Sequence, residues 1–210
     1  FFYITLFSFF MYSNRLIFKT SSDDEIFYLN DTILINFNAN RNGLSTSDLN
    51  GGTNDLYRHV FNQHLSQEKI DYLVDHDVCE YLINECGLMN IDSGLSTGLI
   101  TLAEMKNVSI VTESFRNLEV TAIATAGVRT NASRAGDESS YWQENGEFHF
   151  GTINIILLTN VCLEKSTLTE AFMTITEAKA VALSNLRIPS QYSNGFATGT
   201  GTDGVAVFSN

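Results

Sequence analysis

The chain has 210 residues, of which 44% are hydrophobic and 17% charged, so its composition predicts one folded globular domain over residues 1–210 and excludes wholesale disorder. Its formal net charge of −12 disfavours nucleic acid as a partner, because phosphates need Lys and Arg for neutralisation. Three cysteines without a CxxC pair predict neither a disulfide framework nor a thiolate zinc site, and they favour a reducing, cytoplasmic location.

The first ten residues are mostly aromatic or aliphatic, but they are too few to span a bilayer and lack the basic leader of a signal peptide. We therefore expect no membrane span. Residues 1–12 are interpreted as an extension that is not native, with Met11 as a truer start, and an initial strand is the alternative.

The first third of the chain predicts sheet followed by helix. Three short β-prone runs separated by polar turns are typical of an antiparallel meander. They cover residues 16–19, 26–29 and 32–37, and a polar loop over 38–54 follows, in which 49–54 can take left-handed backbone angles. A short helix over 55–65 and a stronger one over 67–86, ended by Gly87, come next.

The remaining elements are two helices and four strands, three of which are consecutive. We expect a helix from Thr97 to Met105, a hairpin of strands 108–112 and 118–125, a strand over 148–158, a helix from Ser166 or Thr167 to about Leu186, and a final strand over 205–208. Consecutive strands without helices between them predict an α+β fold with a mixed, largely antiparallel sheet layered with helices. A four-layer α/β/β/α arrangement is one form of this fold.

Histidine and cysteine positions indicate no metal site. Asp75, His76, Asp77 and Cys79 match no common ligand spacing and are interpreted as a solvated helix face. His59 and His64 are five residues apart, so they do not share a helix face, and they are assigned no role.

Lys179 interrupts the apolar stripe of the predicted long helix. The other members of this stripe are Leu168, Phe172, Ile175, Ala182 and Leu186. Because an unpaired buried ammonium is costly, Lys179 must either extend to the rim or meet a carboxylate or other acceptors. Glu177 projects almost opposite, so the two are not one salt bridge.

The segment 197–204 alternates Thr and Gly and ends with Asp203 before the last strand. Its backbone N–H groups and the hydroxyls of Thr198, Thr200 and Thr202 could cradle an oxyanion, although a tight turn explains the same pattern. The segment has no Walker lysine and no following helix, which weakens a phosphate-binding interpretation.

A second polar cluster precedes the 148–158 strand. Asn131, Arg134 and Asp137 could hydrogen-bond amides, with Arg129 as a nearby donor and Asn154 on the strand. No His or Cys stands inside these clusters, which argues against a Cys-His or Ser-His-Asp site.

Six segments in this order resemble the adenosylcobinamide amidohydrolase family. They are Leu49-Asn-Gly-Gly52, Thr125-Ala-Gly-Val-Arg129, Asn131-Ala-Ser-Arg-Ala-Gly-Asp137, Gly151-Thr-Ile-Asn-Ile-Ile156, Thr176-Glu-Ala-Lys179 and Ala197-Thr-Gly-Thr-Gly-Thr-Asp203. The resemblance runs from about residue 49 to the end. It implies hydrolysis of the amide that joins the aminopropanol arm to the corrin ring of adenosylcobinamide, giving adenosylcobyric acid for cobalamin salvage.

The resemblance implies a corrinoid substrate that brings its own cobalt, and we expect no further cofactor and no metal site. Asp203 or Glu177 is expected to activate water, Lys179 or Arg134 to orient the acid, and backbone N–H groups to bind the oxyanion; a threonine nucleophile is the second route. The expected substrate-binding residues are Asn50, Gly51, Gly52, Arg129, Asn131, Arg134, Asp137, Asn154, Thr198, Thr200 and Thr202.

Two other functions are open at this point. A corrinoid-binding module without hydrolysis would keep the same polar clusters. A phosphate- or nucleotide-binding enzyme is disfavoured by the missing lysine motif. The sequence leaves the oligomeric state open.

Overall fold

The computed structural model describes residues 14–138 and 152–210. Within these residues, nine strands form one sheet in the order β1-β2-β3-β11-β9-β7-β6, and β4 and β5 extend it from the other side of β3. The strands are β1 (Asn14–Lys19), β2 (Glu25–Leu29), β3 (Thr32–Ser45), β4 (Gly52–His64), β5 (Ser96–Thr101), β6 (Ser109–Phe115), β7 (Leu118–Ala126), β9 (Ile153–Thr159) and β11 (Gly204–Ser209).

The smaller elements complete the described part of the chain. β8 (Ala132–Ser133) and β10 (Gly199–Thr200) pair into a separate two-stranded sheet, and the helices are α1 (Gln67–Val74), α2 (Val78–Met89) and α3 (Lys165–Asn185). Two 3₁₀ turns, Ser93–Leu95 and Met105–Asn107, flank β5. None of the described helices is both long and apolar enough to cross a membrane.

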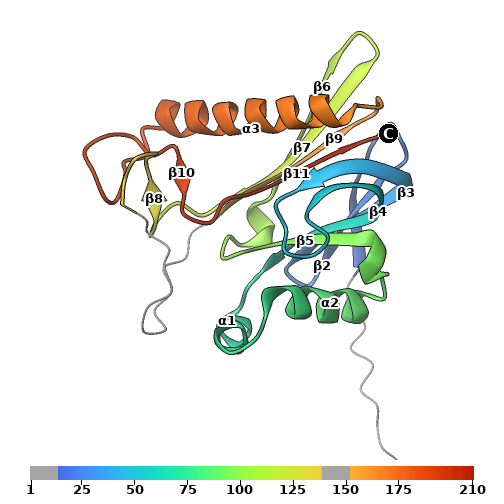
Figure 1. Cartoon of the computed structure of the whole chain (residues 1–210), viewed down its shortest axis with the longest axis horizontal. Coiled ribbons are helices and arrows are strands. Elements are labelled where there is room, and N and C mark those ends of the chain that lie inside the picture. The colour runs from blue at the N-terminus through green and yellow to red at the C-terminus, as the bar shows by residue number, and fades with distance from the viewer. Residues whose placement is uncertain (1–13, 139–151) are drawn as a thin grey trace, which may run out of the picture.

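Strand pairing is mixed, because β5 lies parallel to β4 and β11 lies parallel to β9, whereas the other pairs are antiparallel. The predicted α+β fold with a mixed, largely antiparallel sheet is confirmed. The sheet is continuous and curled, with α3 along one outer side and α1 and α2 along the other (Figure 1). The four-layer α/β/β/α arrangement stays a prediction.

Neighbouring residues of the central strands face different parts of the core. On β3, Ile33 belongs to the cluster inside the curled sheet, whereas Leu34 packs toward α2. On β11, Phe208 faces inward, and Val207 packs beneath Ile175 of α3. Because both faces of these strands are covered, their sequences are continuous apolar runs and not alternating patterns.

That two-sided burial explains two wrong predictions. The helix predicted over 55–65 is part of β4, and the helix predicted over 97–105 is β5 followed by a 3₁₀ turn. On β4, Val60 and Phe61 are fully buried on opposite faces. A short apolar run of this kind cannot be separated from a buried helix by periodicity alone.

The loop predicted over 38–54 is also wrong in its first half, because β3 continues to Ser45. The reason is a buried ion pair in which Arg41 Nη2 donates to Asp24 Oδ2 at 2.5 Å. Because the Arg41 charge is paired, the polar end of β3 can lie within the sheet. The predicted left-handed angles in 49–54 are confirmed at Asn50, with φ 50°, and at Gly52, with φ 81°.

The two long helix predictions are correct in place but wrong in detail. The segment 67–86 breaks into α1 and α2 because the Asp77 side chain caps α2 by accepting from Glu80 N at 3.0 Å. α2 runs past Gly87 to a left-handed Asn90. α3 begins at Lys165, so Thr167 lies inside the helix and forms no capping box.

The apolar stripe of α3 is correct through Ile175 but wrong beyond Lys179. Leu183 is the buried residue there, whereas Ala182 and Leu186 are exposed. The hairpin of β6 and β7 and the final strand are confirmed. The expected extension over 1–12 and the first residues of the strand over 148–158 lie outside the described residues.

Candidate functional site

Two adjoining cavities form a cleft where the α1–α2 junction faces the turn before β11. Their volumes are about 650 Å³ and about 190 Å³. Asp48, Val78, Ile100 and Thr202 line both cavities, so the two are parts of one cleft. The wall from α1 and α2 is largely apolar, while the loop after β3 and the turn before β11 carry polar groups.

Asp203 organises the turn that borders the cleft. Its Oδ1 accepts from Thr200 Oγ1 at 2.5 Å and from Ile153 N at 3.0 Å. Its Oδ2 accepts from Thr200 N at 3.0 Å and from Lys179 Nζ. The side chains of Lys179 and Asp203 are only 11% and 10% exposed, so the carboxylate has four donors and little contact with solvent.

Lys179 therefore meets a carboxylate, which is one of the two fates predicted from its place on an apolar stripe. The approach of β10 to this ion pair requires a glycine. A Cβ added at Gly199 would collide with Asp203 Oδ2 and lie 2.9 Å from Lys179 Nζ. The Thr-Gly alternation of segment 197–204 thus has a structural cause at this position.

Asn154 supports the floor of the cleft through a buried amide network. Its Oδ1 accepts from Gly204 N at 3.1 Å, and its Nδ2 donates to Asn62 Oδ1 at 2.8 Å and to Ile100 O at 3.0 Å. Asn62 in turn donates to Thr125 Oγ1 at 2.9 Å. Side chains from β4, β7 and β9 are joined in this way across the inside of the curled sheet, which fixes the position of the turn before β11.

The three threonines of segment 197–204 have different surroundings. Thr202 lines both cavities, and its hydroxyl lies 2.9 Å from that of Thr152. The Thr200 hydroxyl donates to Asp203, and the Thr198 hydroxyl accepts from Ala135 N at 2.8 Å. Among these three hydroxyls, that of Thr202 is the one at the cleft.

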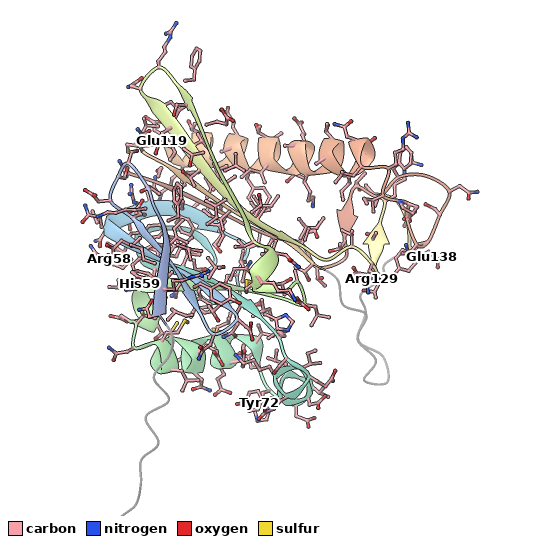
Figure 2. All side chains as sticks on the ribbon, turned by 180° about the vertical axis from the view of Figure 1, so that it is seen from behind. Arg58, His59, Tyr72, Glu119, Arg129 and Glu138 are labelled. Atoms are coloured by element: carbon pink, nitrogen blue, oxygen red, sulfur yellow. The ribbon has the colours of Figure 1, made fainter. Side chains whose placement is uncertain are left out.

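The predicted cluster around residue 131 lies at the small β8–β10 sheet. Asp137 Oδ2 accepts from Ser190 Oγ at 2.6 Å and from Arg134 N at 2.7 Å. These hydrogen bonds, that from Ser190 first, lower the pKa of Asp137 below its usual value. Asn131 is 1% exposed beside β8, and Arg129 lies near the same sheet (Figure 2). The structure therefore brings these residues together, with β10 as their link to the cleft.

The segment 50–52 shapes a loop and lines neither cavity. Asn50 Nδ2 donates to Ser93 O and Ser96 O, each at 2.7 Å, and a Cβ at Gly51 would collide with the carbonyl oxygen of Ser47. These contacts place the loop after β3, which includes Asp48, at the cleft.

Glu177 is not brought to the cleft. It is exposed on α3, and within the described residues no hydrogen bond or ion pair engages its side chain. An acid or base role for Glu177 in the cleft does not fit this position. His59, whose ring nitrogen Nδ1 lies 2.8 Å from Asn36 Oδ1, is far from the β8–β10 sheet (Figure 2).

Several residues at the cleft were not among the predicted site residues. Asp48, Asp75 and His76 all line the larger cavity. The His76 ring stacks on Tyr72 with centroids 3.7 Å apart, and its Nδ1 lies 2.7 Å from Tyr72 O, so Nδ1 carries the proton. The interpretation of residues 75–77 as one helix face is wrong because they form the α1–α2 junction. An aspartate at an N-cap, here Asp77, is the sequence signal that could have located this junction.

Within residues 14–138 and 152–210, no group of three or more His, Cys, Asp or Glu side chains could hold a metal ion. The expectation that the only metal is the cobalt of the substrate stays a prediction.

Comparison with known proteins yields two matches. Residues 17–210 match the model of a family described as adenosylcobinamide amidohydrolase. An uncharacterized protein of Methanocaldococcus jannaschii, MJ1613, is 33% identical over 193 residues, and the match covers 84% of this chain and 72% of that protein.

Proposed function

Because the chain belongs to the adenosylcobinamide amidohydrolase family, we propose that it hydrolyses the amide between the aminopropanol arm and the corrin ring of adenosylcobinamide. The products are adenosylcobyric acid and aminopropanol, for use in cobalamin salvage. The family match over residues 17–210 is the observation that carries this proposal. The cleft supports it with an apolar wall beside a polar turn, which is the usual composition of a small-molecule site.

The turn from Thr200 to Gly204 is our proposed site for the carbonyl oxygen of the scissile amide. The Thr202 hydroxyl and the N–H of Gly201 are assigned as donors, since both residues line the cleft. An amide carbonyl becomes an oxyanion in the tetrahedral intermediate, and one well-placed donor lowers the barrier by about 3 kcal/mol. A turn held in advance by four hydrogen bonds to Asp203 needs no reorganisation during the reaction.

We assign Lys179 and Asp203 the role of positioning this turn. For Asp203 to take a proton from water, its carboxylate would have to give up one of its four donors. Lys179 neutralises this carboxylate in a nearly dry environment, and its ammonium donates to Asp203. The polar cluster of Arg129, Asn131, Arg134 and Asp137 is proposed to bind outlying amides of the corrinoid.

Incubation of the full chain with adenosylcobinamide, with chromatographic detection of adenosylcobyric acid, tests the proposal. Thr202→Val should lower kcat by about 10²-fold or more, because it removes the hydroxyl donor while keeping the side-chain shape. Tight binding of adenosylcobinamide without product would instead identify a corrinoid-binding module. Displacement of the corrinoid by nucleotides would favour a phosphate-binding enzyme.

The attacking group is either water or the Thr202 hydroxyl. A threonine nucleophile forms an ester with the corrinoid acid, whereas direct attack by water leaves the protein unmodified throughout. Mass spectrometry of the protein during turnover separates the two routes.

A further inference from the structure

Asp48 is a carboxylate at the cleft with unoccupied hydrogen-bonding capacity. It lines both cavities, as Thr202 does. The residue is exposed, and within the described residues no hydrogen bond or ion pair engages its side chain. Its oxygens are therefore accessible to a water molecule in the cleft.

The backbone that carries Asp48 is held on both sides. On the side of β11, Thr46 N donates to Val205 O at 3.0 Å, and Val205 N donates to Thr46 Oγ1 at 3.0 Å. On the side of β5, Ser47 Oγ donates to Gly98 O at 2.6 Å. These bonds join the loop directly to the strand that follows the turn, so Asp48 keeps a constant position relative to Thr202 without using its own carboxylate.

The other acidic groups near the cleft are less suited to take a proton. Asp203 has four donors, and Asp77 caps α2. Asp75 lines the larger cavity alone, whereas Asp48 borders the junction with the smaller one. Building on the proposed function, we propose that Asp48 is the catalytic residue that activates the attacking water.

The chemical step balances with Asp48 alone. The ionised carboxylate takes one proton from water as the water oxygen bonds to the amide carbon, and the carbonyl electron pair moves to the oxygen near Thr202. When the oxyanion collapses, the C–N bond breaks, and Asp48 returns the proton to the leaving nitrogen. The products are a carboxylic acid and an amine, and Asp48 ends as a carboxylate.

Because a general base must be ionised to take a proton from water, this role predicts that kcat falls at acid pH. The ionisable groups around Asp48 in the cleft are Asp75, His76 and Asp77 from the α1–α2 junction and Asp203 from the turn, which is paired with Lys179 of α3. Because His76 lines the same cleft, the acid limb should be measured in His76→Gln as well. We expect the limb to persist in His76→Gln and to disappear in Asp48→Asn.

The test is the turnover of adenosylcobinamide by full-length variants over a range of pH. Asp48→Asn should lower kcat by about 10²–10⁴-fold with KM little changed. Asp48→Ala should regain part of its activity when formate is added, because formate can supply the missing carboxylate. Asp55→Asn is the matched control, since Asp55 is an exposed β4 residue that lines neither cavity, and its kcat should equal that of the wild type.

Each outcome decides between a catalytic and another role. Normal turnover by Asp48→Asn overturns the inference but leaves the proposed function standing. A rise in KM alone, or a loss of kcat without formate rescue in a variant with the wild-type melting temperature, identifies a binding or structural contact and also overturns it. A corrinoid ester on the protein during turnover excludes direct attack of water on the amide and overturns the inference. A folded wild-type chain that forms no product overturns the proposed function and this inference together.

Discussion

Asp203 and Asp48 border the same cleft, but their carboxylates are held in opposite ways. Asp203 accepts four hydrogen bonds, including one from Lys179, and is nearly buried. Asp48 is exposed, and the hydrogen bonds that hold it come from the neighbouring Thr46 and Ser47. A carboxylate that accepts several hydrogen bonds holds the surrounding backbone in one conformation. A carboxylate that accepts none, on a backbone held by other groups, keeps its lone pairs available for a reactant. The difference separates a positioning group from a reacting group within one cleft.

The largest expected effect comes from removing the counter-ion of Asp203. Lys179→Met should lower the free energy of unfolding by about 3–5 kcal/mol, because it leaves a nearly buried carboxylate without its cation. Asp48→Asn should change it by less than about 0.5 kcal/mol, as is typical of exposed sites. Urea unfolding of both variants measures the contrast.

Equal effects at the two sites would contradict the contrast between Asp203 and Asp48. A double variant, Lys179→Met with Asp203→Asn, sharpens it. Because the charge that needs neutralising is then absent, the double variant should be more stable than the sum of the two single effects predicts.

A smaller effect is expected from crowding the ion pair without changing its charge. Gly199→Ala places a methyl group against Asp203 Oδ2 and Lys179 Nζ, and should cost about 1–3 kcal/mol of unfolding free energy because the pair must move. Gly87→Ala is the control, since an added Cβ there has no described neighbour within 4 Å apart from adjacent residues and the backbone of α2 itself, and alanine should stabilise by about 0.5–1 kcal/mol. The same thermal or urea unfolding experiment measures both. A neutral Gly199→Ala would show that the turn adapts easily.

Asp137 is intermediate between Asp203 and Asp48 in the number of hydrogen bonds that its carboxylate accepts. Its substitution is expected to have the smallest effect on stability. Ser190 Oγ and Arg134 N donate to it, and these bonds lower its pKa below the usual 3.8. Since the unfolded state then binds protons more readily, the stabilisation by Asp137 is complete above the unfolded pKa and is lost as the pH falls through the lower folded value.

Asp137→Asn should therefore be less stable than the wild type at neutral pH, and the difference should shrink toward the acid end. Urea midpoints of the two proteins along a pH series measure this dependence. Asp55→Asn, at an exposed site, should show no such trend, and a pH-independent deficit in Asp137→Asn would indicate that charge is not the cause.

Sequence patterns located the elements whose exposure is asymmetric. The β6–β7 hairpin and α3 were found because each has a buried and an exposed side. Parts of β4 and β5 were assigned as helices. On β4, Val60 and Phe61 are buried on opposite faces, so the alternation of apolar and polar residues that identifies a strand is absent. The break between α1 and α2 depends on one capping side chain, Asp77, inside a polar stretch that resembles a solvated helix face.

The free-energy cost of burying a charge determined which site residues could be recognised from the sequence. Lys179 stood out because a charge on an apolar stripe needs a partner, and Asp203 because it ends a Thr-Gly run at a strand. Asp48 carries no such signal, since an aspartate in a polar loop costs nothing whether or not it reacts. Glu177 was included for its place beside Lys179, but two residues along a helix point to different sides.

The sequence by itself determined the family, the α+β class and the need of Lys179 for an acceptor, because these depend on ordered motifs, local periodicity and the cost of burying a charge. The tertiary structure decided that the acceptor is Asp203, that its four donors fill its carboxylate, and that residues 48, 100 and 202 meet at one cleft. Contacts between distant segments arise from parallel pairing of β4 with β5 and of β9 with β11, and no local pattern in the chain encodes that pairing.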